Sequence, residues 1–241
     1  KKLKIMSKFL LELMLKKSLN LISVRVVQEL VSPRQVAKQA KLFNLSTRIA
    51  AVDAIALGVS DVIPIEMTSA YATIANGGIY NSPIAINYIQ DQHGRVIKHF
   101  VSDQMEVVDE PLNYILLSMM KDVIDSGTGG SIRWKYKFTS PMAGKTGTTN
   151  NKTDAWFIGF SPDLVVGVYV GYDKPKTLGY KQTGASVAVP IFREFMEKAN
   201  INHNKIPFRI PPGISFVKID PKTGLQSNNK NAILEPFLIG T

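Results

Sequence analysis

The chain of 241 residues carries a formal net charge of +10 and no cysteine. This length can bury the core of one domain, and the lack of cysteine excludes a disulfide framework and thiol catalysis. It suits an oxidising compartment. Many of the lysines stand in the first 17 residues. The other basic residues form neither a basic helix face nor an arginine–aromatic ladder, so we expect no nucleic-acid partner.

No apolar run in the sequence reaches the ~18–20 residues of a membrane-spanning helix. Residues 9–27 are apolar, but Glu12, Lys16 and Arg25 interrupt them. No signal peptide is visible in the sequence. The first residue is not methionine, and we expect the chain to be a piece of a longer polypeptide or an interrupted one.

The first third of the chain is predicted to be helical. Apolar residues recur at helical spacing over 10–15. Ser32, followed by proline and then Gln35, predicts a capped helix that runs to about residue 43. A further short helix is predicted from Thr68 to Asn76, where two glycines follow.

A β-hairpin is predicted next, with strands at 85–89 and 96–100 around a turn at 91–94. Asp109 then predicts the N-cap of a long helix over 110–126, which has apolar residues along one face. The glycine-rich sequence after this helix predicts a loop.

The pattern changes to strands after residue 142. Two apolar strands are predicted at 155–160 and 164–170, and the Ser-Pro-Asp between them is a turn signal. A helix is predicted at about 187–199. These elements indicate an α+β fold in which helices pack on an antiparallel sheet.

The sequence Lys145-Thr146-Gly147-Thr148 stands directly before the first of these strands. An ammonium and two hydroxyls can hold a substrate carboxylate, while the glycine lets the substrate approach the backbone. A phosphate-binding loop is the alternative interpretation. It requires glycine at position 139, where threonine stands, and a helix instead of a strand afterwards.

Lys-Thr-Gly occurs a second time, at residues 222–224. There it follows Asp220-Pro221, and such a sequence is typical of a turn. We therefore expect the first copy to be functional and the second to be structural.

Serine residues supply two further patterns. Ser18-Leu19-Asn20 forms a Ser-x-Asn triplet, which by itself is also typical of a polar turn between helices. Ser-x-x-Lys begins at Ser118, Ser215 and Ser227, but that spacing brings lysine to serine only on a helix. Ser118 alone is on a predicted helix, and it follows the Ser-x-Asn triplet. We expect none of the three to be a nucleophile.

Taken in order, many segments resemble the transpeptidase domain of class A, bifunctional penicillin-binding proteins of the 1A type. The triplets Lys-Thr-Gly and Ser-x-Asn, with Ser-x-x-Lys, mark that family and the class A β-lactamases. The resemblance covers about residues 15–199. It rests on the segments 17–25, 56–58, 63–72, 76–78, 126–129, 143–149, 154–162, 167–173 and 186–192.

The resemblance implies the fold of penicillin-binding proteins and serine β-lactamases, and acyl transfer from D-Ala-D-Ala stem peptides during bacterial peptidoglycan cross-linking. β-Lactams would inhibit this acyltransferase, and no metal or organic cofactor is implied. In that scheme Ser18 relays a proton to the leaving amine, Asn20 orients the substrate amide, and Lys145 binds the terminal carboxylate and polarises Ser18. The implied substrate-binding residues are Thr146, Gly147, Thr148, Gly127 and Thr128.

Some parts of the family pattern are missing from the sequence: Ser-x-x-Lys at the family's place, the glycosyltransferase domain and the membrane anchor. We expect residues 1–204 to be a partial transpeptidase domain, truncated at its N-terminus, and residues 205–241 to be an irregular tail. The implied partners are the upstream half of the domain and the glycosyltransferase domain, with the parent protein at the periplasmic face of the inner membrane.

The sequence leaves three functions open. The first is a D,D-transpeptidase fragment that is inactive alone because it lacks the nucleophile. The second is a D,D-carboxypeptidase or β-lactamase of the same fold, against which the class A flanking segments argue. The third is a non-catalytic remnant or binding module from a split gene.

Overall fold

The computed structural model describes residues 2–199 and 206–240. Its helical elements are α1 (Lys2–Lys17), α2 (Asn20–Glu29), α3 (Pro33–Leu42), the 3-10 helix η1 (Asp53–Leu57), α4 (Pro64–Ala75), α5 (Glu110–Ser126), α6 (Ser131–Trp134), the π-helical turn η2 (Gly184–Ala188) and α7 (Val189–Ala199). Its strands are β1 (Ile79–Asn81), β2 (Tyr88–Gln90), β3 (Val96–His99), β4 (Gln104–Glu106), β5 (Ala143–Thr148), β6 (Ala155–Phe160), β7 (Val165–Val170), β8 (Ile214–Ile219) and β9 (Ile233–Leu238). Across the described ranges, no helix is both long and apolar enough to cross a membrane. The elements make the α+β fold that the sequence predicts.

The central sheet consists of β5, β6 and β7, in that order and antiparallel throughout. Lys145 pairs with Ile158, and Ile158 pairs with Gly167. Paired residues share a face and successive residues alternate between faces. These three residues therefore lie on one face of the sheet, and Phe157 and Val168 lie on the other.

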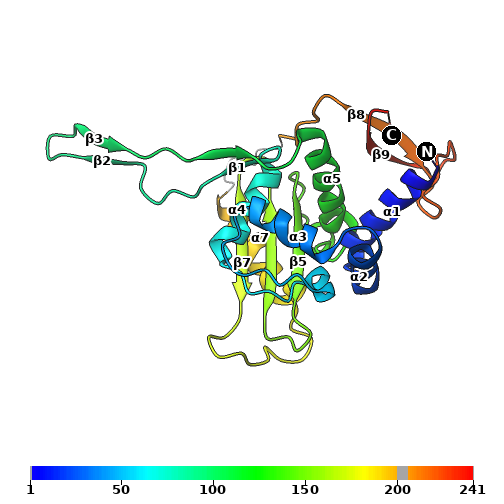
Figure 1. Ribbon diagram of the computed structural model, residues 1–241, viewed down its shortest axis with the longest axis horizontal. Coiled ribbons are helices and arrows are strands. Elements are labelled where there is room, and N and C mark those ends of the chain that lie inside the picture. The colour runs from blue at the N-terminus through cyan, green and yellow to red at the C-terminus, as the bar shows by residue number, and fades with distance from the viewer. Residues whose placement is uncertain (1, 200–205, 241) are drawn as a thin grey trace.

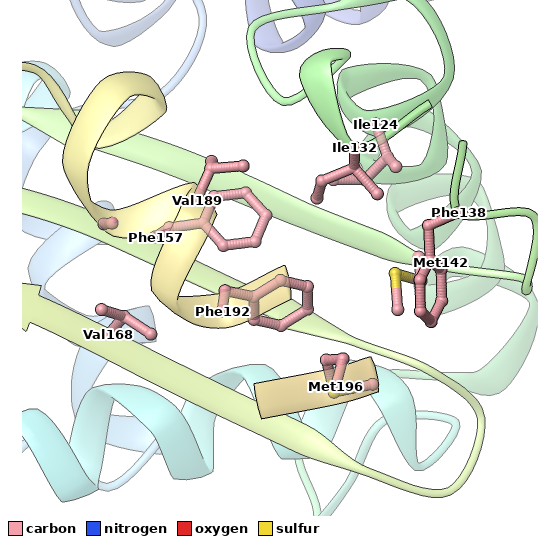
Figure 2. Packing of buried hydrophobic residues seen from close by; sticks show 10 residues of the cluster. Ile124, Ile132, Phe138, Met142, Phe157, Val168, Val189, Phe192 and Met196 are labelled. Carbon is pink, nitrogen blue, oxygen red and sulfur yellow. The ribbon is translucent and has the colours of Figure 1, made fainter. Parts of the chain in front are cut away.

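The face that carries Phe157 is covered by α7. The rings of Phe157 and Phe192 meet edge to face with centroids 4.7 Å apart, and Figure 2 shows Val189 beside them. Ile124 of α5 and Ile132 of α6 extend the same cluster. Each of these side chains is fully buried, which stabilises the fold by about 1.5–3 kcal/mol per large residue.

The opposite face of the sheet is covered by α4 and α5. Phe160 packs there with Ile74 of α4 and with Leu117 of α5. Gly167 permits an unusually close approach of α4, because a Cβ atom at this position would lie 2.2 Å from Oγ1 of Thr68. Helix α4 is thus held directly over the face that carries Lys145.

The predicted helix starts at Ser32 and Asp109 are confirmed. Ser32 Oγ accepts from the Gln35 amide at 3.3 Å while Gln35 Oε1 accepts from the Ser32 amide at 3.0 Å, a complete capping box. The Asp109 carboxylate accepts from the Leu112 amide at the start of α5. Helix α4 begins at Pro64, four residues before the predicted start, because proline is tolerated in the first turn of a helix.

The expectation of an irregular tail is wrong. Strands β8 and β9 pair along their whole length, and Ile219 and Phe237 are buried with Phe9 of α1 packed against them. Most of the proline, glycine and asparagine residues that led to the expectation lie before β8 or in the β8–β9 loop. The predicted boundary between residues 204 and 205 lies outside the described residues.

The predicted β-hairpin is confirmed, with strands β2 and β3 shorter than expected. A second antiparallel pair, β1 with β4, joins it to the rest of the molecule. Every residue of β2 and β3 is exposed. Figure 1 shows the hairpin as an arm that extends away from the helices and the central sheet.

Candidate active site

Strand β5 brings the first Lys-Thr-Gly to the edge of the central sheet. One edge of β5 pairs with β6, and within the described residues no strand pairs with its opposite edge. The side chain of Lys145 lies on the face under α4, whereas the side chain of Thr146 lies on the other face. An edge strand without a strand partner is the kind of element to which an extended peptide adds as a further strand.

Lys145 and Ser18, the two residues expected to act together, are in contact. Lys145 Nζ donates a hydrogen bond of 3.0 Å to Ser18 Oγ and another of 3.0 Å to the carbonyl oxygen of Thr146. Burial lowers the pKa of Lys145 to about 8. The amine is therefore still mainly an ammonium at pH 7, but it releases its proton more readily than an exposed lysine.

Ser18 lies in the turn between α1 and α2. Its φ of 53° is in the left-handed region, which costs a non-glycine residue about 1–2 kcal/mol. Leu19 is extended and donates its amide to Met14 O at 3.0 Å, and Asn20 begins α2. The turn exposes Ser18 and Asn20 at the surface and directs the Ser18 hydroxyl to Lys145.

The loop after α5 connects Ser18 and β5. The Thr128 amide donates to Lys16 O at 3.1 Å, and Thr128 Oγ1 lies 2.7 Å from Thr146 Oγ1. Gly127 is required for this approach, since a Cβ atom there would lie 2.5 Å from Lys16 O. The predicted binding residues Gly127, Thr128 and Thr146 thus surround the Lys145–Ser18 pair.

Thr148 lies at the end of β5, where its Oγ1 accepts a hydrogen bond of 3.0 Å from the Gly184 amide. Its hydroxyl proton can still be donated to a ligand. Gly147 lies against Trp156, and a Cβ atom on Gly147 would be 3.1 Å from Trp156 Cβ. The backbone therefore approaches the next strand closely here.

A second group of polar residues was not predicted from the sequence. Asp154 accepts hydrogen bonds from Tyr169 Oη at 2.7 Å and from Thr153 Oγ1 at 2.6 Å, and these bonds hold its pKa below the ordinary value. The Tyr169 ring packs against Trp156, with centroids 4.8 Å apart. Strand alternation places Trp156 on the Lys145 face, but Tyr169 joins it only through the register of β6 with β7.

A cavity of about 700 Å³ adjoins these residues. One side is formed by residues 145–149, which lie in β5 and directly after it, together with Trp156 and Tyr169. The other side is mainly apolar and comes from α3, η1 and α4. Its lining includes Val36, Ala40, Ile55, Leu57, Met67 and Tyr71. The polar site thus borders an apolar space large enough for a protein segment or a ligand.

The second Lys-Thr-Gly lies in the β8–β9 loop and has turn geometry. Asp220 Oδ1 accepts from the amides of Lys222 and Thr223 at 2.7 and 3.2 Å, and Asp220 O accepts from the Gly224 amide at 2.8 Å. Gly224 has a φ of +66°. The turn predicted for this copy is therefore present.

The serines of the three Ser-x-x-Lys patterns lie outside the segments that form the candidate site. Ser118 is within α5, eight residues before its end at Ser126, or roughly 12 Å along the helix axis. Ser215 is in β8, and Ser227 is in the loop before β9. Only the helical pattern at Ser118 has the spacing that brings lysine close to serine.

Comparison with known proteins gives consistent results. Residues 10–197 match the family model described as the penicillin binding protein transpeptidase domain. The chain is 37% identical over 246 residues to penicillin-binding protein 1A of Rickettsia prowazekii (strain Madrid E), with 92% of this chain and 31% of the relative covered. It is 37% identical over 200 residues to penicillin-binding protein 2D of Bacillus subtilis (strain 168), with 80% and 28% covered.

The fold is similar to the crystal structure of penicillin-binding protein 1A from Haemophilus influenzae. The TM-score is 0.87 at 27% sequence identity, and the match covers 96% of this chain and 40% of that chain. The chain thus spans about 30% of the length of the curated relatives it matches.

Proposed function

The chain belongs to the penicillin-binding protein transpeptidase family, and we propose that it supplies the carboxylate-binding and proton-relaying part of a D,D-transpeptidase site for peptidoglycan cross-linking. The observation that carries this proposal is the 3.0 Å hydrogen bond from Lys145 Nζ to Ser18 Oγ. A partly buried lysine beside a serine hydroxyl can both bind a carboxylate and assist proton transfer.

In the proposed reaction, a serine hydroxyl attacks the carbonyl carbon of the penultimate D-alanine and gives its proton to a nearby base. The resulting oxyanion re-forms the carbonyl as the bond to the terminal D-alanine nitrogen breaks. Ser18 Oγ–H donates its proton to that nitrogen and takes up in return the proton held by the base. An amine from a second stem peptide then attacks the acyl-serine and loses a proton, which passes to the departing serine oxygen, so that the cross-link forms and the serine is regenerated.

Lys145 has two parts in this scheme. Its ammonium donates to Ser18 Oγ, so the hydroxyl proton of Ser18 points away from the lysine and toward the leaving nitrogen. The same ammonium, with the hydroxyls of Thr146 and Thr148, attracts the terminal carboxylate of the stem peptide. A charge-assisted hydrogen bond of this kind is roughly twice as strong as a neutral one.

The nucleophile is proposed to come from outside these 241 residues. Ser118 lies roughly 12 Å along α5 from the loop that contacts the Lys145–Ser18 pair. The cavity beside Lys145 has an apolar side with Ile55, Leu57 and Tyr71. A segment carrying Ser-x-x-Lys on an amphipathic helix would cover this apolar side and bring its serine to Ser18.

This assignment defines the proposed partners. They are stem peptides that end in D-Ala-D-Ala, β-lactams that acylate the same serine, the upstream half of the transpeptidase domain, and a glycosyltransferase domain. The parent protein is proposed to act at the periplasmic face of the inner membrane. The net charge of +10 is compatible with anionic polymers of the cell envelope.

Labelling with a fluorescent penicillin, followed by denaturing electrophoresis, tests the proposal. We expect no labelled band from this chain alone. A band should form when the upstream half of the domain is supplied, fused or as a separate chain, and the label should be on that half. A stable band from this chain alone that is lost in Ser118→Ala would overturn the proposal.

A further inference from the structure

A group of charged side chains, three of them buried and Asp122 half-buried, lies at the junction of α1, α5 and the β8–β9 hairpin, away from Lys145. Carboxylate oxygens of Glu12, Asp122 and Glu235 all lie within 4.8 Å of one another. Glu12 and Glu235 are only 4% and 7% exposed, and Lys8, one helical turn before Glu12, is 9% exposed. In Figure 1, α5, α1 and the β8–β9 hairpin lie close together on the side of the molecule away from the β2–β3 arm.

The charges in this group do not balance. Lys8 Nζ lies 2.8 Å from Glu235 Oε2 and 3.9 Å from Glu12 Oε2. Three ionised carboxylates would therefore face one ammonium. Like charges at such distances in a buried site cannot all remain ionised, so one group takes up a proton.

Glu12 is the group best placed to hold that proton. Its Oε2 is buried and has no hydrogen-bond partner among the described residues. Its carboxyl group is close enough to Asp122 to share a hydrogen bond, which two carboxyl groups can form only when one of them is protonated. Glu235, by contrast, has Lys8 as a direct ionic partner.

We propose that Lys8, Glu12, Asp122 and Glu235 form a proton-dependent clasp that holds α1 and the β8–β9 hairpin against α5 and thereby positions Ser18. Glu12 holds the proton and Lys8 forms the ion pair with Glu235. Asp122, on α5, connects this group to that helix through its hydrogen bond with Glu12. Burial, the shared hydrogen bond and the neighbouring carboxylates raise the pKa of Glu12, and Lys8 only partly offsets these effects.

The clasp is connected to the candidate active site through the two helices that form it. Glu12 is six residues before Ser18 on α1, or roughly 9 Å along the helix axis. Asp122 is one turn before the end of α5, and the following Thr128 donates its amide to Lys16 O at 3.1 Å. Glu12 and Lys8 are thus positioning residues for Ser18; this step rests on the proposed function, whereas the clasp itself does not.

A divalent cation is the other occupant that three carboxylates could hold. Lys8 argues against it, because an ammonium already lies among these oxygens and would repel the cation. With Glu12 neutral, the two remaining carboxylates and the Lys8 ammonium leave one net negative charge in the group. One proton therefore brings the group close to neutrality without a metal ion.

The test compares wild type with Glu12→Gln, which has the shape of the protonated carboxyl group. Thermal unfolding and the hydrogen-exchange protection factor of the Thr128 amide are measured from pH 5 to pH 8, below the range in which Lys145 loses its proton. In wild type both should fall as pH rises, because the unfolded Glu12 ionises near pH 4.5 and the folded one near pH 8. The folding equilibrium constant should decrease by about 10²–10³-fold across this window.

In Glu12→Gln the pH dependence over this range should be lost, so the variant should be more stable than wild type at pH 8 and similar to it at pH 5. Glu29→Gln, on the exposed pair with Arg25, is the matched control and should follow wild type. These measurements need neither substrate nor nucleophile, so their outcome is independent of the proposed transpeptidase function.

Two results would overturn the clasp. One is a Glu12→Gln profile that falls with pH as wild type does. The other is a saturable rise in the unfolding temperature of wild type with Ca²⁺, Mg²⁺ or Mn²⁺ that is lost in Glu12→Gln, which would assign the group to a metal. Carbon-13 NMR of the Glu12 carboxyl group gives a second readout, and titration at the ordinary glutamate pKa would also contradict the proposal.

Discussion

The same three residues, Lys-Thr-Gly, occur in a strand of the central sheet and in the loop of the C-terminal hairpin. In β5, Lys145 is partly buried and donates a hydrogen bond to Ser18. In the β8–β9 loop, Lys222 is exposed, and its backbone amide donates to Asp220 Oδ1. The chemistry of the triplet thus depends on what its lysine faces. In the first copy the lysine side chain forms part of the candidate site, whereas in the second copy the glycine conformation forms the turn.

The largest expected difference between the two copies is in acylation. With the upstream half of the domain supplied, Lys145→Ala should reduce the rate of penicillin acylation by about 10²–10³, the usual loss for one preorganised electrostatic group. Lys222→Ala, the matched control, should leave the rate unchanged. Stopped-flow or gel-based acylation rates provide the measurement. Equal losses in the two variants would show that Lys145 has no special part in acylation.

The stability of the folded chain at high pH should also separate the two lysines. The folded Lys145 has a pKa of about 8, below its ordinary 10.5, so between these values the unfolded chain binds more protons. Stability should therefore rise with pH over this window, by up to about 3 kcal/mol. Lys145→Met should remove this rise in urea unfolding curves measured from pH 8 to 10.5. Lys222→Met should keep it.

A smaller effect is expected from the hydroxyls. Thr128 Oγ1 and Thr146 Oγ1 lie 2.7 Å apart, and loss of one hydrogen bond costs about 0.5–1.5 kcal/mol. Thr146→Val should therefore slow acylation by up to about tenfold, and the double variant with Thr128→Val should show a non-additive loss. Thr223→Val in the second copy is the control. Additive losses would indicate that the two threonines act separately.

In the second copy the glycine, and not the lysine, should affect the stability of the fold, and the direct effect on acylation should be the smallest of all. Gly224 has a φ of +66°, and a Cβ atom there would lie 2.7 Å from Phe9 Cβ. Gly224→Ala should lower the free energy of unfolding by about 1–2 kcal/mol, without a direct effect on acylation. Lys222→Ala should change it by less than about 0.5 kcal/mol. An unchanged free energy of unfolding in Gly224→Ala would mean that the stability of the fold does not depend on this turn.

The elements predicted from the sequence are those with local signals. The caps at Ser32 and Asp109 are read from neighbouring residues, and the structure confirms both. The β8–β9 hairpin was missed because proline, glycine and asparagine dominate its surroundings, and its packing partner, Phe9, lies at the other end of the chain. Local patterns do not contain such distant contacts.

Contacts between distant residues also limit how much of the candidate site can be predicted from the sequence. The family motifs identified Ser18, Lys145 and Thr146, and the structure brings these residues together. The role of Tyr169 depends on strand register, which periodicity does not specify. The carboxylates around Glu12 come from three separate elements, and each of them alone resembles an ordinary surface residue in the sequence.

The distance along the chain between contacting residues also has a consequence for the order of folding. Ser18 meets Lys145 across 127 positions, and Lys8 meets Glu235 across 227, whereas α5, the central sheet and α7 follow one another closely. Local contacts form sooner than contacts that close long loops. We therefore expect the central sheet to assemble first, and the contacts of α1 with the β8–β9 hairpin to form last.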